Sequence, residues 1–388
     1  MIRKLKNQIH PSVAAVLVVL VLAVVLGVWW RGLVYRPPSK PGGGPGGGPA
    51  PIKADINILG RKDVQVTTLA GDQEPGDADG LGYIARFDRP TGLALDAQGA
   101  LYVADTGNNR IRKILPDGQT ATLAGGEIGY ADGPALQARF NAPCGVCAAP
   151  DGALYVADTG NHCIRKIWKG QVSTLFGKPT GSAAPKPGDP NAMSLPTGIS
   201  FVTPTGAGEK PYLLVADAGD RCLRSLDLKG TAATKIPLPG PPTAAMIVPT
   251  PGRPPGQPMW LAAIPQSGIL LLSAQTLKEI PIAGGQSIPG IKSPALRRPV
   301  ALFPHGEGWL VADNDNAAVF HVRNGVAENL AGHCSSSGPM RGMRDGDGSH
   351  AAFSILGGVV SDSKKLVYVA DTANNMIRRL TIPETIGH

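Results

Sequence analysis

The chain has 388 residues, including 51 glycines and 37 prolines, and this proportion of turn-forming residues argues against a mainly helical protein. Hydrophobic residues make up 43% and charged residues 17%, which is sufficient for a packed core and excludes a chain that is disordered throughout. The net charge is +8, but residues 1–51 hold six basic and no acidic residues. The remainder carries only about +2, which argues against a nucleic-acid partner.

The first element in chain order is an uninterrupted run of 18 apolar residues at 13–30, long enough to cross most of a bilayer as a helix. We predict a single transmembrane helix there, after a cytoplasmic tail at 1–12. A buried core helix and a cleaved signal peptide are the alternatives, but nothing polar interrupts the run and no small-x-small cleavage site follows it. Basic residues nearly balance on its two sides, so orientation depends on the short leading tail. We expect an inner- or plasma-membrane protein whose body is periplasmic or extracellular.

The segment at 37–51 contains six prolines and six glycines, a composition that leaves nothing to bury. We predict a linker here that spaces the following domain, residues 52–388, from the membrane.

The domain at 52–388 repeats itself. RPTGLALDAQGALYVADTGNNRIRKILPDGQTATLAG at 89–125 is followed by the closely matching APCGVCAAPDGALYVADTGNHCIRKIWKGQVSTLFG at 142–177. Weaker copies begin at 195, 299 and 355, and a stretch from 243 keeps the hydrophobic rhythm but loses the aspartate. Short apolar runs alternate with turn residues, which predicts four antiparallel strands per repeat. Packed radially, such sheets cover one another's faces, so we predict an all-β, six-bladed β-propeller.

The two ends of the domain predict how the ring closes. The last repeat supplies three strands and lacks a fourth, whereas VQVTTLAG at 64–71 has the character of a fourth strand and precedes the first repeat. We therefore predict that residues 64–70 pair with residues 376–382.

The string LYVADTGNNRIRKI, with PTGLALD before it and TLAG after it, closely resembles the NHL repeat family over roughly residues 64–382. The resemblance implies the propeller fold. Members of the family include extracellular sensor domains on a membrane tether, RNA-binding and ubiquitin-ligase-associated propellers, and a zinc-dependent peptidylglycine amidating lyase. Function therefore has to be argued from the residues of this chain.

The first strands, which would line the central channel, read TGLAL, CGVCAA, TGISF, TAAMIV, VALF and GGVV. No acid or imidazole appears near their starts, where the resemblance to the amidating lyase, or to calcium-dependent lactonases, implies metal ligands. We predict no catalytic residue, metal or cofactor. A lyase- or lactonase-like enzyme with an atypical channel site remains the alternative. The sequence contains five cysteines and does not determine whether they form disulfides. It does not determine the oligomeric state either.

Five aspartates end the second strand of a repeat, and four arginines take equivalent places on third strands. We interpret these aspartates as structural residues that bond backbone N–H groups of their own turns, with pairing to the arginines between blades as a further hypothesis. These structural residues are Asp105, Asp158, Asp217, Asp313, Asp371, Arg112, Arg165, Arg224 and Arg378.

The loops that join blades are longer and recur as an Asp-Gly pair followed by a segment ending at Phe87, Phe140 or Phe353. Each phenylalanine is expected to fill the seam between blades. Elaborated loops on a rigid scaffold are typical binding sites, so we expect a protein or ligand to dock on this face outside the cytoplasm. The candidate binding residues are Asp79, Asp132, Asp347, His333, Arg341 and Arg344.

Overall fold

The computed structural model describes residues 58–177, 192–203, 208–247, 259–265, 268–273, 280–282, 296–323, 326–335 and 338–383. These belong to one compact unit, Asp55–His388. The predicted tail, transmembrane helix and linker lie outside the described residues. Within the described ranges, no helix combines the length and the apolar character needed to cross a membrane.

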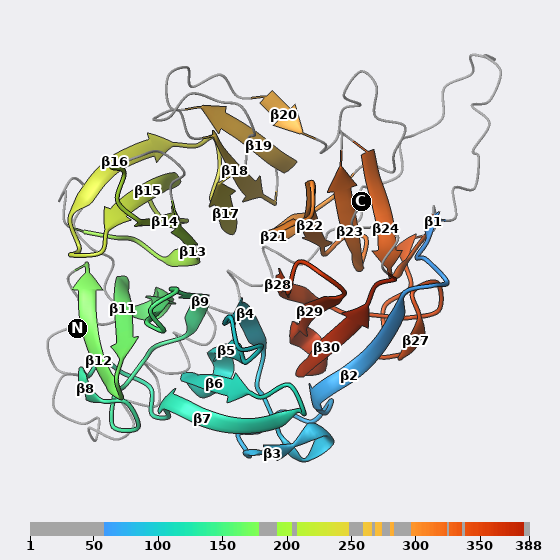
Figure 1. Cartoon of the computed structure of the whole chain (residues 1–388), viewed down its shortest axis with the longest axis horizontal. Helices are drawn as coiled ribbons and strands as arrows, with labels where there is room; N and C mark the ends of the chain where they lie inside the picture. Colours follow the sequence, from blue (N-terminus) through green and yellow to red (C-terminus); the bar gives the residue numbers. More distant parts are fainter. Residues whose placement is uncertain are drawn as a thin grey trace, which may run out of the picture. The chain divides into compact units, whose positions relative to one another are not determined.

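The strands form antiparallel sheets arranged around a centre, as a β-propeller (Figure 1). Blade one consists of β4 (Pro90–Leu95), β5 (Leu101–Asp105), β6 (Arg110–Ile114), β7 (Gln119–Gly125) and the short outer strand β3 (Gly80–Leu81). Blade two repeats this order with β9 (Pro143–Ala148), β10 (Leu154–Asp158), β11 (Cys163–Trp168), β12 (Gln171–Phe176) and outer β8 (Gly133–Pro134). Blade three has β13 (Pro196–Val202), β14 (Tyr212–Asp217), β15 (Cys222–Asp227) and β16 (Ala232–Pro237).

The remaining strands follow the same plan. Blade five has β21 (Pro299–His305), β22 (Gly308–Asp313), β23 (Ala318–Arg323) and β24 (Val326–Ala331), and blade six has β28 (Leu356–Ser361), β29 (Leu366–Asp371), β30 (Met376–Thr381), β2 (Gln65–Gly71) and outer β27 (Gly346–Asp347). These five blades carry the repeat's aspartate. At the predicted fourth position, β17 (Ala244–Ile247), β18 (Met259–Ile264), β19 (Gly268–Ser273) and β20 (Ile280–Ile282) form a four-stranded sheet without it. We predicted a six-bladed propeller. The propeller is confirmed, but blades of the repeat are found at five positions rather than six among the described residues.

Smaller elements complete the domain. β1 (Ile58–Leu59) pairs with β25 (His333–Ser335), which also pairs with β26 (Gly338–Pro339). One-turn 3-10 helices lie at η2 (Gly82–Ile84), η3 (Thr106–Asn108), η4 (Thr159–Asn161) and η5 (Thr372–Asn374).

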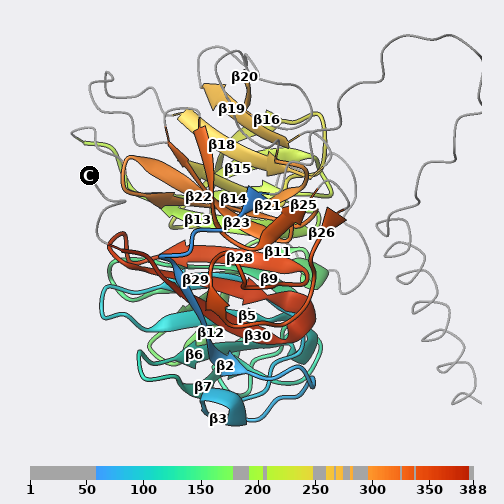
Figure 2. The ribbon, with the colours of Figure 1, turned by 90° about the vertical axis from the view of Figure 1, so that its right-hand side faces the viewer.

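The ring closes through β2 and β30, and the predicted pairing is confirmed. Val66 faces Leu380 and Thr68 faces Arg378 in an antiparallel register. Figures 1 and 2 both show β2, from the start of the domain, beside β30 from its end. Because the early strand completes the last blade, neither strand is left with a free edge at the junction.

Neighbouring blades pack through apolar clusters at their seams. Phe140 is fully buried in a cluster that contains Ile111 from blade one and Val156 from blade two. Phe87 and Phe353 are equally buried in the clusters of the adjoining seams, so the phenylalanines lie where the sequence predicted.

The first strands approach one another closely around the centre. A Cβ atom on Gly92 of β4 would lie 2.2 Å from the Cys144 carbonyl oxygen of β9. On Gly145 it would lie 2.3 Å from the Thr197 carbonyl oxygen of β13. Glycine is therefore required at this position in successive first strands, because any side chain would push the blades apart.

Candidate functional site

The repeated aspartates and arginines form buried ion pairs inside single blades. The carboxylate of Asp105, at the end of β5, lies 2.9 Å from the guanidinium of Arg112 on β6, and both side chains are fully buried. The pairs Asp158–Arg165, Asp371–Arg378 and Asp217–Arg224 measure 2.8, 2.9 and 2.7 Å. The hypothesis that these pairs bridge different blades is wrong, because the second and third strands of one sheet place both side chains on the same face.

Each of these aspartates also receives backbone hydrogen bonds, although not those that the sequence predicted. Asp105 accepts from the N–H of Asp88 at 2.8 Å, and Asp158 accepts from the N–H of Asn141 at 2.8 Å. These amides precede the blade's first strand by sequence and do not belong to the turn of the aspartate itself. Among the described residues no arginine side chain pairs with Asp313, which accepts from the N–H groups of Arg297, Arg298 and Asn316. Asn316 belongs to the turn of Asp313 itself, so the predicted hydrogen bond is present in this blade.

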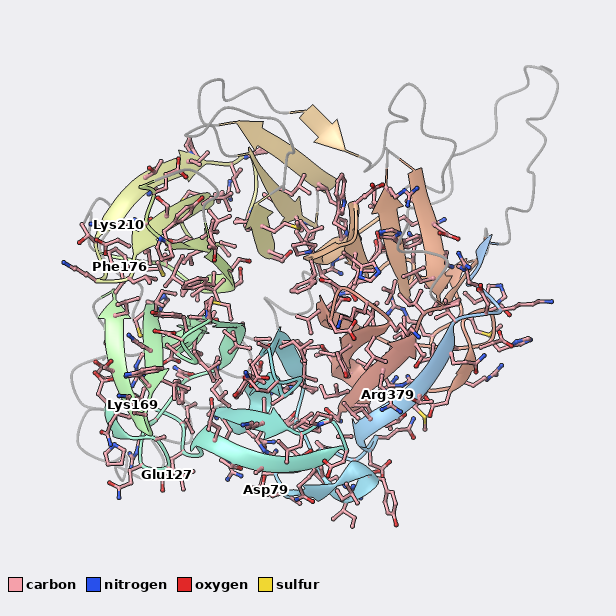
Figure 3. The ribbon with its side chains drawn as sticks, viewed as in Figure 1. Asp79, Glu127, Lys169, Phe176, Lys210 and Arg379 are labelled. Atoms are coloured by element: carbon pink, nitrogen blue, oxygen red, sulfur yellow. The ribbon has the colours of Figure 1, made fainter. Side chains whose placement is uncertain are left out.

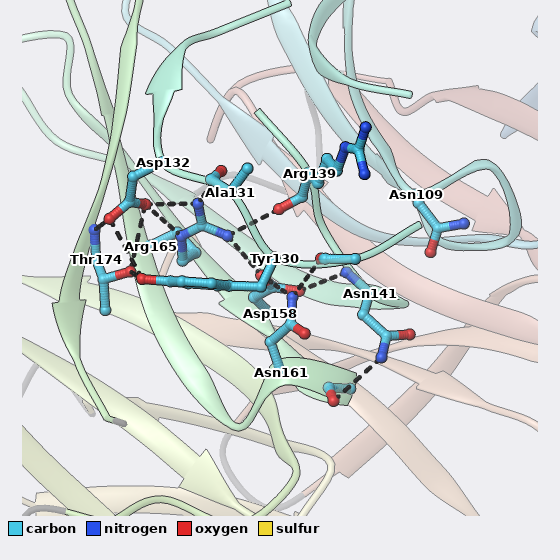
Figure 4. Close-up of polar contacts among 12 residues, drawn as sticks. Asn109, Tyr130, Ala131, Asp132, Arg139, Asn141, Asp158, Asn161, Arg165 and Thr174 are labelled. Atoms are coloured by element: carbon cyan, nitrogen blue, oxygen red, sulfur yellow. Dashed lines mark hydrogen bonds and ion pairs between the residues drawn. The ribbon is translucent and has the colours of Figure 1, made fainter. Parts of the chain in front are cut away.

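A second carboxylate from the inter-blade loop completes the network in three blades. The guanidinium of Arg165 lies 2.6 Å from Asp132, whose other oxygen accepts the N–H of Thr174 (Figure 4). Tyr130 covers the same guanidinium, with its ring centre 4.8 Å away. In blade one the corresponding residue is Asp79, 2.6 Å from the Arg112 guanidinium.

In blade six the third member is Asp345, which lies 2.6 Å from the Arg378 guanidinium. The spacing of the sequence predicted Asp347 at this place, and that prediction is wrong. The segment Asp345-Gly-Asp-Gly offers two Asp-Gly pairs, and only hydrogen bonding to a third strand distinguishes them. Asp347 instead accepts hydrogen bonds from Ser349, at 2.5 Å from its hydroxyl, and lies 2.8 Å from the ring of His350.

Burial controls the ionisation of this network. Removal from water raises the pKa of Asp105 and of Asp158 to about 6, despite hydrogen bonds from asparagine, backbone amide and arginine that favour the charged form. Raised carboxyl pKa values are typical of acid catalysts, but these side chains are fully buried and saturated by internal donors. We therefore assign the network to the stability of the blades.

Contacts between blades use a different residue of the turn. The side-chain oxygen of Asn109 accepts the N–H of Ala142 at 2.8 Å, which connects blade one to the segment entering blade two. In blade two the residue is His162, whose Nδ1 accepts the N–H of Leu195 at 3.1 Å. A backbone N–H can only donate, so His162 is neutral in this contact, in agreement with the lowering of its pKa by burial.

One group among the described residues brings three potential metal ligands together, namely Asp217, Asp220 and Cys222, with ligand atoms within 4.8 Å of one another. Arg224 bonds both carboxylates, and the ammonium of Lys235 lies 2.9 Å from Asp220. Two positive charges already occupy the carboxylates, and burial raises the pKa of the thiol to about 12. The donor set therefore does not suit a cation.

A buried histidine pair lies at the seam between blades five and six. His305 Nδ1 is 2.8 Å from the Ser361 hydroxyl, and His321 Nε2 is 3.3 Å from the His305 carbonyl oxygen. His305 is the last residue of β21. Burial lowers the pKa of both imidazoles, and both are only 3 to 4% exposed. A serine–histidine contact is the beginning of a nucleophilic site, but here it is enclosed in the seam.

The inter-blade loops expose apolar side chains on the outer side of the ring. We call residues 72–88, 126–141 and 338–354 rim loops 1, 2 and 3; each adds a short strand to the outer edge of a blade. Figure 3 shows Asp79 and Glu127, from rim loops 1 and 2, at the outer margin of the sheets. Of the large exposed hydrophobic residues among those described, all but Leu115 belong to these loops: Leu81, Tyr83, Ile84, Ile128, Tyr130, Leu136, Met340 and Met343. Hydrophobicity along the sequence did not single them out, because exposure depends on the fold.

The candidate basic residues of rim loop 3 are partly committed to internal contacts. The Arg341 guanidinium donates to the backbone oxygens of Ser354 and Asn314. Arg344 is exposed, while its backbone oxygen accepts from Arg378. His333 is half-buried at the start of β25. Arg341, Arg344 and His333 therefore do not form one site with Asp79 or Asp132, whose ion pairs with Arg112 and Arg165 lie in blades one and two.

Comparison with known proteins agrees with this architecture. The NHL repeat model matches residues 87–114 and 140–167. The chain is 38% identical over 124 residues to NHL repeat-containing protein 2 of Gallus gallus, covering 29% of this chain and 17% of that protein. The chain thus spans about a sixth of this relative's length.

Solved propellers share the fold at low identity. An auxiliary nutrient binding protein from Bacteroides thetaiotaomicron has a TM-score of 0.56 and 14% identity, covering 82% of this chain and 76% of that one. The gluconolactonase XC5397 from Xanthomonas campestris has a TM-score of 0.52 and 11% identity, covering 87% and 99%. This chain therefore contains NHL repeats and folds as a β-propeller.

Proposed function

We propose that this protein is a membrane-tethered propeller whose rim loops bind a protein partner outside the cytoplasm. The observation that carries the proposal is the concentration of exposed apolar side chains on three equivalent loops of a rigid ring. Exposed apolar groups that recur on one structural element are typical of interaction sites. The apolar run at 13–30 supports the tether, and the linker at 37–51 would let the domain reorient above the bilayer.

The residues of the buried network support binding rather than catalysis. The carboxylate of Asp105 and the terminal guanidinium nitrogens of Arg112 bond each other and neighbouring backbone, as do their counterparts in blades two and six. A scaffold needs this rigidity, because a partner that docks on ordered loops pays little for ordering them.

Photo-crosslinking in cells tests the binding function. A photoreactive amino acid is placed in the full chain at Tyr83, at Met343, or at Lys229 on the turn between β15 and β16. We expect discrete adducts from the rim-loop positions and none from Lys229. Adducts that are absent at every position would contradict the proposal. Protease protection of the domain in intact cells tests the orientation separately.

An enzymatic function is the second candidate, and the contact between His305 and Ser361 is the observation that favours it. If the seam opened, Ser361 could act as a nucleophile with His305 as its base. Assays of the full chain with simple lactones, before and after Ser361→Ala, decide this point. Turnover that disappears in the variant would replace the scaffold proposal.

A further inference from the structure

The outer edge of blade one gathers four exposed apolar side chains. Leu81, Tyr83, Ile84 and Leu115 are 49, 76, 55 and 40% exposed. β3 pairs with β7, and the Gly82 N–H donates to the Gly118 carbonyl at 3.2 Å. Rim loop 1 is therefore held against the turn that carries Leu115, and the four side chains share one edge of the blade. We call this set the blade-one patch.

Buried neighbouring residues and backbone hydrogen bonds hold the loop that carries the patch in place. Ala85 and Phe87, which follow η2 directly, are fully buried, and the Arg86 guanidinium contacts the carbonyl oxygen of Tyr83. Backbone pairing between Arg86 and Ala78 closes the loop at 3.0 Å. The apolar side chains thus face water from an ordered loop and do not collapse into the core.

The surroundings of the patch are acidic. Asp77 and Asp79 have side chains 61 and 49% exposed, and they pair with Arg110 and Arg112 respectively. Arg112 is shared with the buried Asp105, and the exposed Glu74 and Asp117, the latter in the turn beside Leu115, make no ion pair among the described residues. Negative charge is therefore in excess around the patch. Such a border repels an anionic lipid surface and attracts a cationic partner.

We propose that the blade-one patch binds a segment of a partner protein in which apolar side chains stand next to lysine or arginine. The apolar side chains would cover Tyr83 and Ile84, and the cations would face the acidic border. This inference rests on the proposed function and specifies the surface and the partner's chemistry. Burial of the exposed aromatic and aliphatic side chains supplies the affinity, and the acidic residues around the patch favour a partner with positive charge.

Two fluorescent peptides of about 15 residues test the inference, one with leucine and lysine and one with leucine and glutamate in the same order. Fluorescence anisotropy measures their binding to the full chain in detergent micelles. We expect the basic peptide to bind at least about tenfold more tightly than the acidic one, and to weaken as salt rises from about 50 to about 300 mM.

The variant Tyr83→Ser/Ile84→Ser is expected to weaken the basic peptide at least about tenfold, which is about 1.4 kcal/mol. Lys229→Ser, on the equivalent turn of blade three, is the control and should stay within about twofold. Unfolding midpoints of both variants show whether the ring remains folded.

Different outcomes separate the two proposals. Equal binding by the patch variant, with adducts still forming from rim loop 3 in cells, would overturn the patch and leave the scaffold function standing. No adduct from any rim loop would overturn the scaffold function itself. Self-association of the full chain, or binding to phosphatidylcholine vesicles, that is lost in Tyr83→Ser/Ile84→Ser would assign the patch to a second copy or to lipid and overturn the inference.

Discussion

His162 makes the stability of the ring depend on pH, and the substitution His162→Asn tests the reason. Its Nδ1 accepts the Leu195 N–H at 3.1 Å, and the side chain is only 4% exposed. Protonation would remove this acceptor and leave the amide without its partner. Asn109 and Asn375 make the same contact with a group that does not titrate.

The sign follows from the lowered pKa. In the unfolded chain the imidazole takes up a proton near its ordinary pKa, whereas burial lowers the pKa of His162 in the folded chain. The unfolded state therefore binds more protons below about pH 6.5, and the stability present at neutral pH is lost as the pH falls. Loss of one buried hydrogen bond costs about 1–3 kcal/mol, which sets the upper size of the effect.

Urea unfolding of the full chain and of His162→Asn, measured at about pH 7.5 and about pH 5.5, isolates this contribution. His162 has a left-handed backbone with φ of 56°, a conformation that asparagine adopts readily, so the variant should fold. We expect the wild type to lose about 1 kcal/mol more than the variant over this range. The buried His305 and His321 are present in both proteins and cancel in the comparison. Identical pH dependence would refute the assignment.

Three further substitutions, with Arg139→Met as a control for the first, test the ion pairs and the packing through the free energy of unfolding. Arg165→Met should destabilise by about 3–5 kcal/mol, because it leaves a buried carboxylate unpaired, whereas Arg139→Met, whose partner is exposed, should change stability by less than about 1 kcal/mol. Gly92→Ala should cost at least about 1–3 kcal/mol, since the new methyl group would overlap a neighbouring carbonyl. Phe140→Ala should cost about 3–5 kcal/mol through the cavity left in the seam, and a loss below about 1 kcal/mol would show that the seam is not close-packed.

The strand order and the closure of the ring could be predicted because the repeat has a distinct pattern of residue types along the sequence. Alternating apolar runs and turn residues predicted the strands, and the missing fourth strand of the last repeat identified its partner near Val66. For the buried network of aspartates and arginines, the sequence predicted which residues take part but not how they pair. Asp105 and Arg112 were identified, but whether they join strands or blades depends on which faces meet, and one sequence does not specify this.

The exposed surface was the least predictable part. A hydrophobic residue in a loop can be buried or exposed, and rim loop 1 contains both, since Phe87 is buried while Tyr83 is 76% exposed. The distinction arises from the pairing of β3 with β7, a contact of two residues on each side. So short a strand has no periodic signal of its own.

The rim loops link the buried network to the candidate binding surface. In rim loop 1, Asp79 bonds the buried Arg112 and the backbone then turns outward, through Gly80 with φ of 149°, into the exposed residues of the patch.

Asp79→Asn should therefore affect peptide binding by the patch, although Asp79 is not one of its four apolar residues. It weakens the anchor of the loop, so binding of the basic peptide should fall while the four apolar side chains remain chemically intact. Asp77→Asn removes a charge of the same border that pairs only with Arg110, which is partly exposed. If position mattered more than charge, Asp79→Asn would weaken binding several-fold more than Asp77→Asn, and hydrogen exchange of the amides at 80–84 would accelerate only in Asp79→Asn. Equal losses without faster exchange would mean that Asp79 contributes through its charge alone.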